Sequence, residues 1–463
     1  MSEPFDRPGP AWVTDHNAAM LVDLYELTMV QAYLRGGMDE LAVFDLFIRR
    51  LPSSRNYLIA AGLDDVLRYL ETITFGDDAI EYLRSTGRFG DDMLDWLREF
   101  RFTGDVYAMP EGAVAFADEP LVQIVAPLPQ AQLIETFVLN QIHLQTMLAS
   151  KAARVVDAAR GRSLLDFGLR RMHGTDAGMK AARALYIAGV GATSNVLAGQ
   201  VYGIPVAGTM AHSYIQAHDD ERSAFEAFAS VYPDTTLLVD TYDTIEGVRR
   251  VIELAGRLGE AFAVQAIRLD SGDLGELARQ ARRMLDDAGL SHVNIIASGG
   301  LDEYAIDELL AGDAPIDGFG VGTKLGVSAD APTLDSAYKL SAYAGRGRMK
   351  LSTDKSNLPD RKQVYRSYDG RGRMVGDTIA RHDESLDGTP LLTPVMRHGQ
   401  RLDAGRETLD HMRDRAATHR EALPDPLRSL TPADEPYPVA ISDGLRADVD
   451  RLRSEIGRPT LAE

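Results

Sequence analysis

"TTLLVDTYDTIEGVRRVIELAGRLGEAFAVQAIRLDSGD", residues 235–273, contains two short apolar runs separated by one helical pattern. Each run has the length of a buried strand and ends in a polar turn, "DTYD" after the first and "DSGD" after the second. Between them the apolar residues recur at intervals of three and four, which is the period of a helix. Strand, helix and strand in this order predict a βαβ unit, and therefore an α/β fold on a parallel sheet.

The same alternation continues on both sides of this stretch. Further strand-like runs are "SLLDFG" from 163, "GIPVAG" from 203, "VNIIASGG" from 293 and "IDGFGVGT" from 316. Helical patterns lie between them, and several end in glycine, as helix C-termini often do. Six such strands with helical connections predict a (β/α) barrel.

Composition limits the class of protein. The chain has 463 residues, of which 45% are hydrophobic and 25% charged, enough for two or three cores. It has no apolar run of about 18 residues and no N-terminal signal pattern, so we expect a cytoplasmic protein without a membrane partner. The net charge of -20 argues against nucleic-acid binding. The absence of cysteine excludes disulfides, iron-sulfur ligation and a thiol nucleophile.

Polar turns follow the predicted strands. The turns are "DFGLRR", "GTMAHS", "DTYDT", "RLDSGD", "SGGLDE" and "GVGTKL". In a (β/α) barrel such turns meet at the C-terminal ends of the strands, where active sites lie. Helix capping explains the Asp and Ser residues of these turns, but it does not explain "FGLRR" or "GTMAHS". The pattern therefore predicts an active site built from these six turns.

Two of the turns are suited to phosphate. Their glycines let the backbone approach an anion closely, and the next helix offers free N–H groups. These residues are Ser298, Gly299 and Gly300 in the first turn, and Gly320, Gly322 and Thr323 in the second. Asp270 and Asp273 precede them and suit either Mg²⁺ on a polyphosphate or the hydroxyls of a ribose. The G-x-G of "AGVGATSNVLAG" lacks a third glycine and a preceding strand, which disfavours a dinucleotide fold.

Nine motifs in one order carry a resemblance to a known family. They are "DLYELTMVQAYL" (23–34), "FDLFIRRLP" (44–52), "LLDFGLRRMHGTDAG" (164–178), "GATSNVLAG" (191–199), "GTMAHS", "LLVDTYDT", "RLDSGDL", "FGVGT" and "LPDPLRSL". In these motifs the chain resembles the ATP-coupled nicotinate phosphoribosyltransferases. The resemblance covers nearly the whole sequence.

The resemblance implies an α/β fold with an irregular (β/α) barrel. We expect an N-terminal α/β domain in residues 1–130, the barrel in 131–345, and a C-terminal segment in 346–463 that returns to the N-terminal domain. From about 344 the sequence becomes basic and turn-rich with strand signals, which predicts a small β unit before the last helices. This basic stretch is either a solvated face or a flap that faces phosphate.

The resemblance also implies a reaction. The family joins nicotinate to 5-phosphoribosyl 1-pyrophosphate, giving nicotinate mononucleotide and pyrophosphate for NAD biosynthesis. The step is coupled, as in a ligase, to hydrolysis of ATP through a phosphohistidine, and ATP and Mg²⁺ are the expected cofactors. By match to "GTMAHS" the phosphorylated residue is His212. Asp240, at the end of the next strand, is our candidate for the carboxylate that orients this imidazole.

The remaining roles follow by position in the family motifs. Phe167 and Tyr25 would enclose the pyridine ring, with Tyr25 supplied by the partner subunit of a homodimer whose active sites are shared. The nicotinate carboxylate would bind Arg268, Thr209 and Ser213. Pyrophosphate or phosphate would bind Arg170 and Arg49, the ribose Asp270, and the 5-phosphate Gly299, Gly320, Gly322 and Thr323; Lys324, Lys339 and Lys350 are possible helpers. The ligands of the metal are not indicated.

The sequence also indicates a preference between pyridine substrates and leaves alternative functions open. Ser194 stands where amide-using relatives carry an aspartate, which favours nicotinate over nicotinamide. The alternatives are a nicotinamide or quinolinate phosphoribosyltransferase, a barrel lyase or isomerase acting on a sugar phosphate, and a non-enzymatic sensor of NAD metabolites. ATP consumption that rises when nicotinate is added would distinguish an ATP-coupled nicotinate phosphoribosyltransferase from all of these alternatives.

Overall fold

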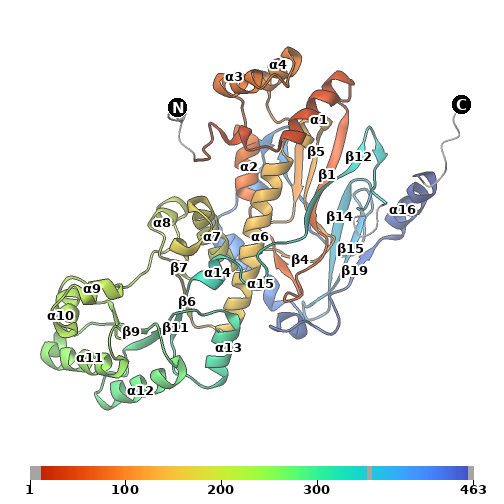
Figure 1. The fold of residues 1–463 in the computed structure, drawn as a ribbon. Helices are drawn as coiled ribbons and strands as arrows, with labels where there is room; N and C mark the ends of the chain where they lie inside the picture. Colours follow the sequence, from red (N-terminus) through yellow and green to blue (C-terminus); the bar gives the residue numbers. More distant parts are fainter. Residues whose placement is uncertain (1–11, 352–356, 457–463) are drawn as a thin grey trace, which may run out of the picture.

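The computed structural model describes residues 12–351 and 357–456. Their strands form a seven-stranded, a six-stranded and a four-stranded sheet and one two-stranded ribbon, β2 (Leu58–Ile59) with β4 (Val114–Ala115). Figure 1 shows the six-stranded sheet and its helices at the lower left and the other sheets at the upper right. The long helix α6 (Glu135–Ala158) runs between these two parts (Figure 1).

The six-stranded sheet is parallel and curled, with the order β7-β6-β11-β10-β9-β8. Its strands are β6 (Ser163–Asp166), β7 (Ala192–Thr193), β8 (Thr236–Leu238), β9 (Ala266–Leu269), β10 (Asn294–Ala297) and β11 (Gly318–Val321). Strands β6, β8, β9, β10 and β11 fall on predicted runs, and the expected irregular (β/α) barrel is confirmed. Because β7 and β8 are edge strands, the barrel is open between them.

The prediction of a strand in "GIPVAG" is wrong. This segment forms only an isolated bridge between Thr193 and Val206, beside the short strand β7, which the sequence analysis did not predict. Pro205 has no N–H to donate and contributes only its carbonyl, which accepts from Thr193 N. The chain therefore leaves the sheet here and continues into the loop that ends at His212.

Helices connect the strands and cover the sheet. They are α7 (Thr175–Ala188), α8 (Val196–Tyr202), α9 (His212–Gln216), α10 (Glu221–Val231), α11 (Thr244–Leu258), α12 (Leu274–Asp287), α13 (Glu303–Ala311) and α14 (Thr323–Gly326). Asp243, Asp273 and Asp302 are the N-caps of α11, α12 and α13, and each accepts a hydrogen bond from a backbone N–H of the first turn. Capping thus explains part of the polar turns, including Asp273.

The seven-stranded sheet draws strands from three regions of the chain, in the order β13-β12-β1-β5-β3-β17-β18. The strands are β1 (Leu41–Ile48), β3 (Asp105–Ala108), β5 (Pro120–Pro127), β12 (Ser336–Tyr343), β13 (Arg346–Gly347), β17 (Thr393–Arg397) and β18 (Gln400–Arg401). β17 and β18 bring the C-terminal segment back to this sheet. β12 lies inside the predicted barrel segment, but it pairs with β1 along its length, since both sides of β11 are already occupied by β6 and β10.

The helices of the N-terminal region pack around this sheet. They are α1 (Leu24–Arg35), α2 (Leu63–Thr72), α3 (Asp77–Ser85), α4 (Asp91–Glu99) and α5 (Leu128–Leu133). One continuous cluster of buried apolar side chains runs from these helices through α6 to the barrel strands. The barrel and the N-terminal region therefore share one core, which fixes the site relative to both.

The basic segment that begins at 344 forms β13 and part of the four-stranded sheet. This sheet contains β14 (Lys362–Tyr368), β15 (Met374–Arg381), β16 (Thr389–Pro390) and β19 (Val439–Ile441), with α15 (Leu409–Glu421) and α16 (Asp443–Ile456) following in the chain. In Figure 1, β14 and β15 lie far from the barrel helices α9 to α12. Residues 352–356 of this segment lie outside the described residues. No helix in the described part of the chain is long and apolar enough to cross a membrane.

Candidate active site

Arg268 is the central cation at the open end of the barrel. It lies on β9, and its NH1 donates a hydrogen bond of 2.7 Å to Thr209 Oγ1, while NH2 lies 3.4 Å from the carbonyl oxygen of Met210. Its Nε is buried and has no hydrogen-bond partner within the described residues. Burial lowers the pKa of Arg268, although the nearby carboxylates of Asp270 and Asp240 act in the opposite direction. This guanidinium retains donors for a ligand carboxylate.

Phe167 lies beside this cation. It follows β6, and its ring centroid is 5.8 Å from the Arg268 guanidinium carbon. A Cβ at Gly320 would lie 2.5 Å from the Phe167 ring, so the ring rests directly on the backbone of β11. A glycine at 320 thus makes room for an aromatic platform next to Arg268. Both packing in the barrel and stacking on a ligand ring are compatible with this position.

His212 is the first residue of α9, and its side chain is 41% exposed. Its Nδ1 lies 3.1 Å from Thr241 Oγ1, and its Nε2 lies 3.7 Å from Asp270 Oδ2. The histidine therefore has a hydroxyl at one ring nitrogen and a carboxylate near the other. Ser213, which follows it, is exposed at the same turn.

The expected contact between Asp240 and His212 is not the one the structure shows. Asp240 Oδ2 accepts hydrogen bonds from Asp270 N at 3.0 Å and Ser271 Oγ at 2.6 Å. The reason is that the chain turns after β8, so that Asp240 points toward the loop after β9. Asp270, on that loop, supplies the carboxylate near the imidazole. The other oxygen of Asp240, Oδ1, is buried without a partner among the described residues.

The two glycine turns lie side by side, after β10 and after β11. Gly299 has a φ of +91°, and a Cβ there would lie 1.9 Å from the carbonyl oxygen of Asp270. Gly300 also has a positive φ, +66°. Lys324 Nζ, in the second turn, donates to Asp302 Oδ2 of the first at 2.7 Å. The two predicted phosphate turns therefore have glycine-dependent geometry and are tied to each other.

Sequence analysis did not single out Asp166, which shapes the turn that bears Phe167. This carboxylate is buried and accepts from Gly168 N and from Thr193 Oγ1, each at 2.8 Å. Its backbone oxygen accepts from Ser194 N at 2.9 Å. Burial raises the pKa of Asp166, against the effect of these hydrogen bonds. An aspartate at the last position of an apolar strand, directly before "FG", was the available signal.

Comparison with known proteins identifies the family. A family model described as the nicotinate phosphoribosyltransferase N-terminal domain matches residues 20–143, and one described as the nicotinate phosphoribosyltransferase family matches residues 162–356. A nicotinate phosphoribosyltransferase of Mycobacterium tuberculosis is 56% identical over 441 residues, which cover 95% of each chain. The chain belongs to the nicotinate phosphoribosyltransferase family. The family resemblance drawn from the nine motifs is thereby confirmed.

Other relatives agree with this assignment. A nicotinate phosphoribosyltransferase of Bacillus subtilis is 43% identical, covering 81% of this chain and 78% of its own. The crystal structure of the human nicotinic acid phosphoribosyltransferase superposes with a TM-score of 0.84 at 29% identity, covering 93% of this chain and 99% of that one. The fold of this family member is therefore close to that of an experimentally solved relative over nearly its whole length.

Two of the expected substrate-binding residues have no hydrogen bond or ion pair with the predicted residues of the barrel end, within the described part of this chain. Tyr25 is on α1 and 47% exposed, and α1 and α9 lie at opposite ends of the molecule in Figure 1. Arg49 directly follows β1, and its NH1 binds Asp335 Oδ1 at 2.9 Å. The structure thus brings together Phe167, Arg268, Thr209, His212, Asp270 and the glycine turns, but not Tyr25 and Arg49. Arg170 and Thr323 are exposed on turns of the barrel end, and Ser194 is half-buried there.

Carboxylates at the barrel end suit a metal that is bound mainly through phosphate. Among the described residues no cluster of three or more His, Asp or Glu side chains forms a metal site by itself. Mg²⁺, however, usually takes only one or two protein carboxylates and completes its shell with water and phosphate oxygens. Asp270, which is half-exposed, and the unpartnered Oδ1 of Asp240 match that donor set. Residues 240 and 270 are therefore compatible with a Mg²⁺–phosphate complex.

Proposed function

We propose that this protein is a nicotinate phosphoribosyltransferase that forms nicotinate mononucleotide and pyrophosphate from nicotinate and 5-phosphoribosyl 1-pyrophosphate. The observation that carries the proposal is Arg268, a half-buried residue whose Nε is buried without a partner among the described residues, beside the ring of Phe167. An aromatic acid can place its ring against Phe167 and its carboxylate on Arg268 and Thr209. The names of the relatives at 56% and 43% identity support the same substrate.

The transfer needs no protein nucleophile. The ring nitrogen of nicotinate forms a bond to the anomeric carbon of the ribose as the bond to pyrophosphate breaks, and the electron pair leaves with pyrophosphate. The chain's contribution is to align the two reactants and to stabilise the separating charges. In this proposal the turns at 298–300 and 320–324 hold the 5-phosphate, and Asp270 faces the ribose. Mg²⁺, when bound near Asp240 and Asp270, supplies neutralising charge for the pyrophosphate.

We further propose that the reaction is coupled to ATP through His212. A neutral imidazole is a good nucleophile, and a hydroxyl at Nδ1 can fix which nitrogen carries the proton. Thr241 is placed for this role, since its Oγ1 lies 3.1 Å from His212 Nδ1. The γ-phosphoryl group would pass to the imidazole as ADP departs, and water would later release it as inorganic phosphate. We place the reaction in the cytoplasm, where ATP is available.

The first test is a coupled assay of the purified protein. With nicotinate, phosphoribosyl pyrophosphate, ATP and Mg²⁺, we expect nicotinate mononucleotide and pyrophosphate, and hydrolysis of ATP that rises when nicotinate is added. Mass spectrometry of the product and release of inorganic phosphate measure the two parts separately. Product formed only from nicotinamide or quinolinate, or no product from any pyridine, would reject the proposed substrate. If nicotinate mononucleotide forms but ATP hydrolysis does not rise when nicotinate is added, the proposed coupling to ATP is wrong and the proposed substrate stands.

We also propose that the active site is shared across a homodimer. Tyr25 lies on α1, far from α9 of its own chain (Figure 1), and Arg49 is paired with Asp335, so a second copy could bring these two residues to the barrel opening. The barrel end also carries an apolar surface on α8 and the segment after it, with Val196 71%, Leu197 53%, Val201 59% and Val206 52% exposed. Burying such a surface against an identical subunit would stabilise a dimer and exclude water from the reaction.

Mixing two variants that should each lack ATP-coupled transfer tests the shared site. One chain carries Tyr25→Ala with Arg49→Ala, and the other carries His212→Ala. If sites are shared, a mixed dimer has one site with all the defects and one intact site, so up to about half of the dimers regain activity. Coexpression with two different affinity tags isolates the mixed species. If the purified mixed dimers show no activity above either parent variant, the shared-site proposal is wrong.

A further inference from the structure

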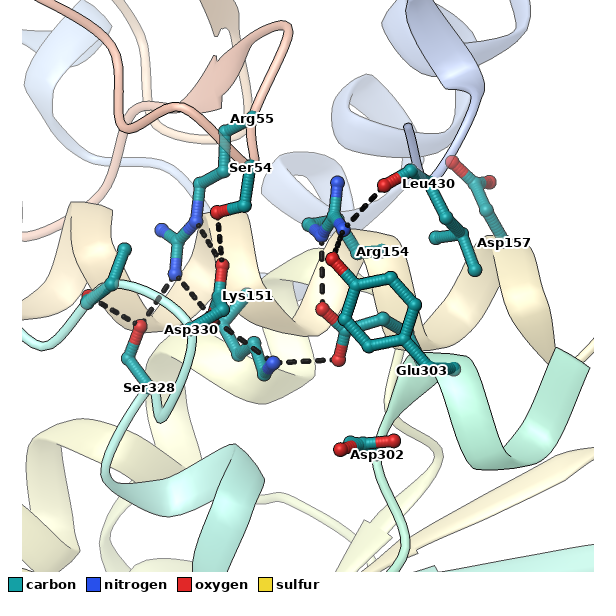
Figure 2. Close-up of polar contacts among 12 residues, drawn as sticks. Ser54, Arg55, Lys151, Arg154, Asp157, Asp302, Glu303, Ser328, Asp330 and Leu430 are labelled. Carbon is teal, nitrogen blue, oxygen red and sulfur yellow. Dashed lines mark hydrogen bonds and ion pairs between the residues drawn. The ribbon is translucent and has the colours of Figure 1, made fainter. Parts of the chain in front are cut away.

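A cluster of buried charges lies behind the two phosphate turns. We call it the buried ion cluster, and its members are Arg55, Lys151, Arg154, Glu303 and Asp330 (Figure 2). The side chains of Lys151 and Glu303 are 2% and 0% exposed. They come from the loop after β1, from α6, from the start of α13 and from the segment after α14. The cluster therefore joins parts of the chain that are far apart in sequence.

Glu303 connects the first phosphate turn to α6. It is the first residue of α13 and directly follows Asp302, the N-cap that ends the turn at 298–302. Its Oε2 accepts from Lys151 Nζ at 2.6 Å, and its Oε1 accepts from Arg154 Nε at 3.0 Å. Both oxygens of this carboxylate are thus held by cations of one rigid helix. The start of α13, and with it the turn, has a fixed position on α6.

Asp330 makes the corresponding connection for the second turn. It lies four residues beyond α14, and Lys151 Nζ is 3.0 Å from its Oδ1. Arg55 Nε and Ser54 Oγ donate to its Oδ2 at 3.0 Å and 2.9 Å. Burial alone would raise its pKa, but hydrogen bonds and charge from Arg55, with the charge of Lys151, hold the pKa of Asp330 below its usual range. Lys151 therefore contacts an anion from each of the two segments.

The arrangement constrains both turns from two sides. On the solvent side Lys324 joins Asp302, and on the buried side Lys151 joins Glu303 to Asp330. Figure 2 shows Lys151 between these two carboxylates, with Arg55 and Ser54 reaching Asp330 from the opposite side. The cluster contains three cations and two carboxylates, so it leaves positive charge beneath turns that would receive a phosphate dianion. Buried ion pairs cost desolvation energy and are a weak source of stability, which leaves geometry as their contribution here.

We propose that Lys151 and Glu303 are positioning residues for the 5-phosphate of phosphoribosyl pyrophosphate. They hold the turns at 298–302 and 320–324 at the separation that one phosphate group spans, without contacting it. The inference rests on the proposed function, because it takes these turns as the phosphate site. It predicts a selective effect: loss of the cluster weakens the affinity for phosphoribosyl pyrophosphate and leaves the nicotinate pocket around Arg268 and Phe167 unchanged.

The test compares Glu303→Gln with a matched control. Glutamine keeps the size of the side chain but removes the charge that faces Lys151 and Arg154. We expect the KM for phosphoribosyl pyrophosphate to rise about tenfold, while the KM for nicotinate changes less than about twofold. The control is Asp377→Asn, which breaks an equally buried pair with Arg366, 2.6 Å long and 0% exposed on both sides, in the four-stranded sheet. Both variants should lose thermal stability, but only Glu303→Gln should change the KM.

A charge-retaining variant keeps the test decisive if Glu303→Gln does not fold. Glu303→Asp withdraws the carboxylate by one methylene, and we expect about a threefold rise in the KM for phosphoribosyl pyrophosphate alone. An unchanged KM in the folded variant, or an equal rise in the Asp377→Asn control, would overturn the inference. A parent protein that makes no nicotinate mononucleotide in the same assay would instead contradict the proposed function, so the two failures are distinguishable.

Discussion

Replacing Arg268 with methionine is expected to lower kcat/KM for nicotinate by about a thousandfold. Arg268 is half-buried at the barrel end, it donates to Thr209, and its Nε is buried without a partner among the described residues. A nicotinate carboxylate brought into this place without the cation would lose its charge-assisted hydrogen bonds and remain desolvated, at a cost of about 4 kcal/mol. Initial rates at varied nicotinate, with phosphoribosyl pyrophosphate saturating, measure the effect.

The same substitution should remove the preference for the acid. In the parent protein nicotinamide would leave the charge of Arg268 uncompensated, so we expect it to be a poor substrate by several orders of magnitude. In Arg268→Met the two pyridines should become similar, because neither meets a cation. Arg283→Met is the control, since that side chain is 65% exposed on α12 and should change neither rate. Comparable kcat/KM values for both pyridines in the parent protein would contradict the assignment of Arg268.

Local patterns in the sequence were sufficient to predict the barrel. The runs that became β6 and β8 to β11 have strand length and are separated by segments with helical period, and these properties depend only on nearby residues. The exception at "GIPVAG" is also local, because Pro205 cannot donate to a ladder. β12 is different: whether a strand joins the barrel or pairs with β1 depends on which sheet edge is free, and that is decided only when the chain has folded.

In the candidate site, too, features set by nearby residues could be predicted from the sequence, but contacts set by the folded chain could not. Glycines at 299 and 320 could be predicted to line a close backbone approach, since a side chain at either position would collide with Asp270 or Phe167. The sequence could not decide between Asp240 and Asp270 as the carboxylate near His212. Both residues follow barrel strands, and only the direction of each turn distinguishes them. Lys151 and Glu303 lie 152 residues apart in the chain, and no short motif relates them.

Phosphorylation of His212 is the second expected result with a large effect. Incubation with ATP labelled in the γ-phosphoryl group should give a labelled protein whose label is lost in acid and stable in base, as is typical of a phosphohistidine. His212→Ala should carry at least about a hundredfold less label, because the backbone is kept and only the nucleophile is removed. The same variant should lose the hydrolysis of ATP that nicotinate stimulates, while slow transfer without ATP continues through the intact Arg268 and phosphate turns.

Two further variants make this result specific to the geometry of the turn. His218→Ala removes a histidine just beyond α9, whose Nδ1 lies 2.9 Å from the carbonyl oxygen of Tyr214, and it should leave labelling unchanged. Thr241→Val removes the hydroxyl that lies 3.1 Å from His212 Nδ1, and it should slow labelling about tenfold without abolishing it, since the imidazole remains but is no longer held in one tautomer. Peptide mapping by mass spectrometry at neutral pH locates the phosphoryl group. If His212→Ala retains the label, His212 is not the phosphoacceptor; if Thr241→Val matches the parent rate, orientation by Thr241 is not needed for phosphoryl transfer.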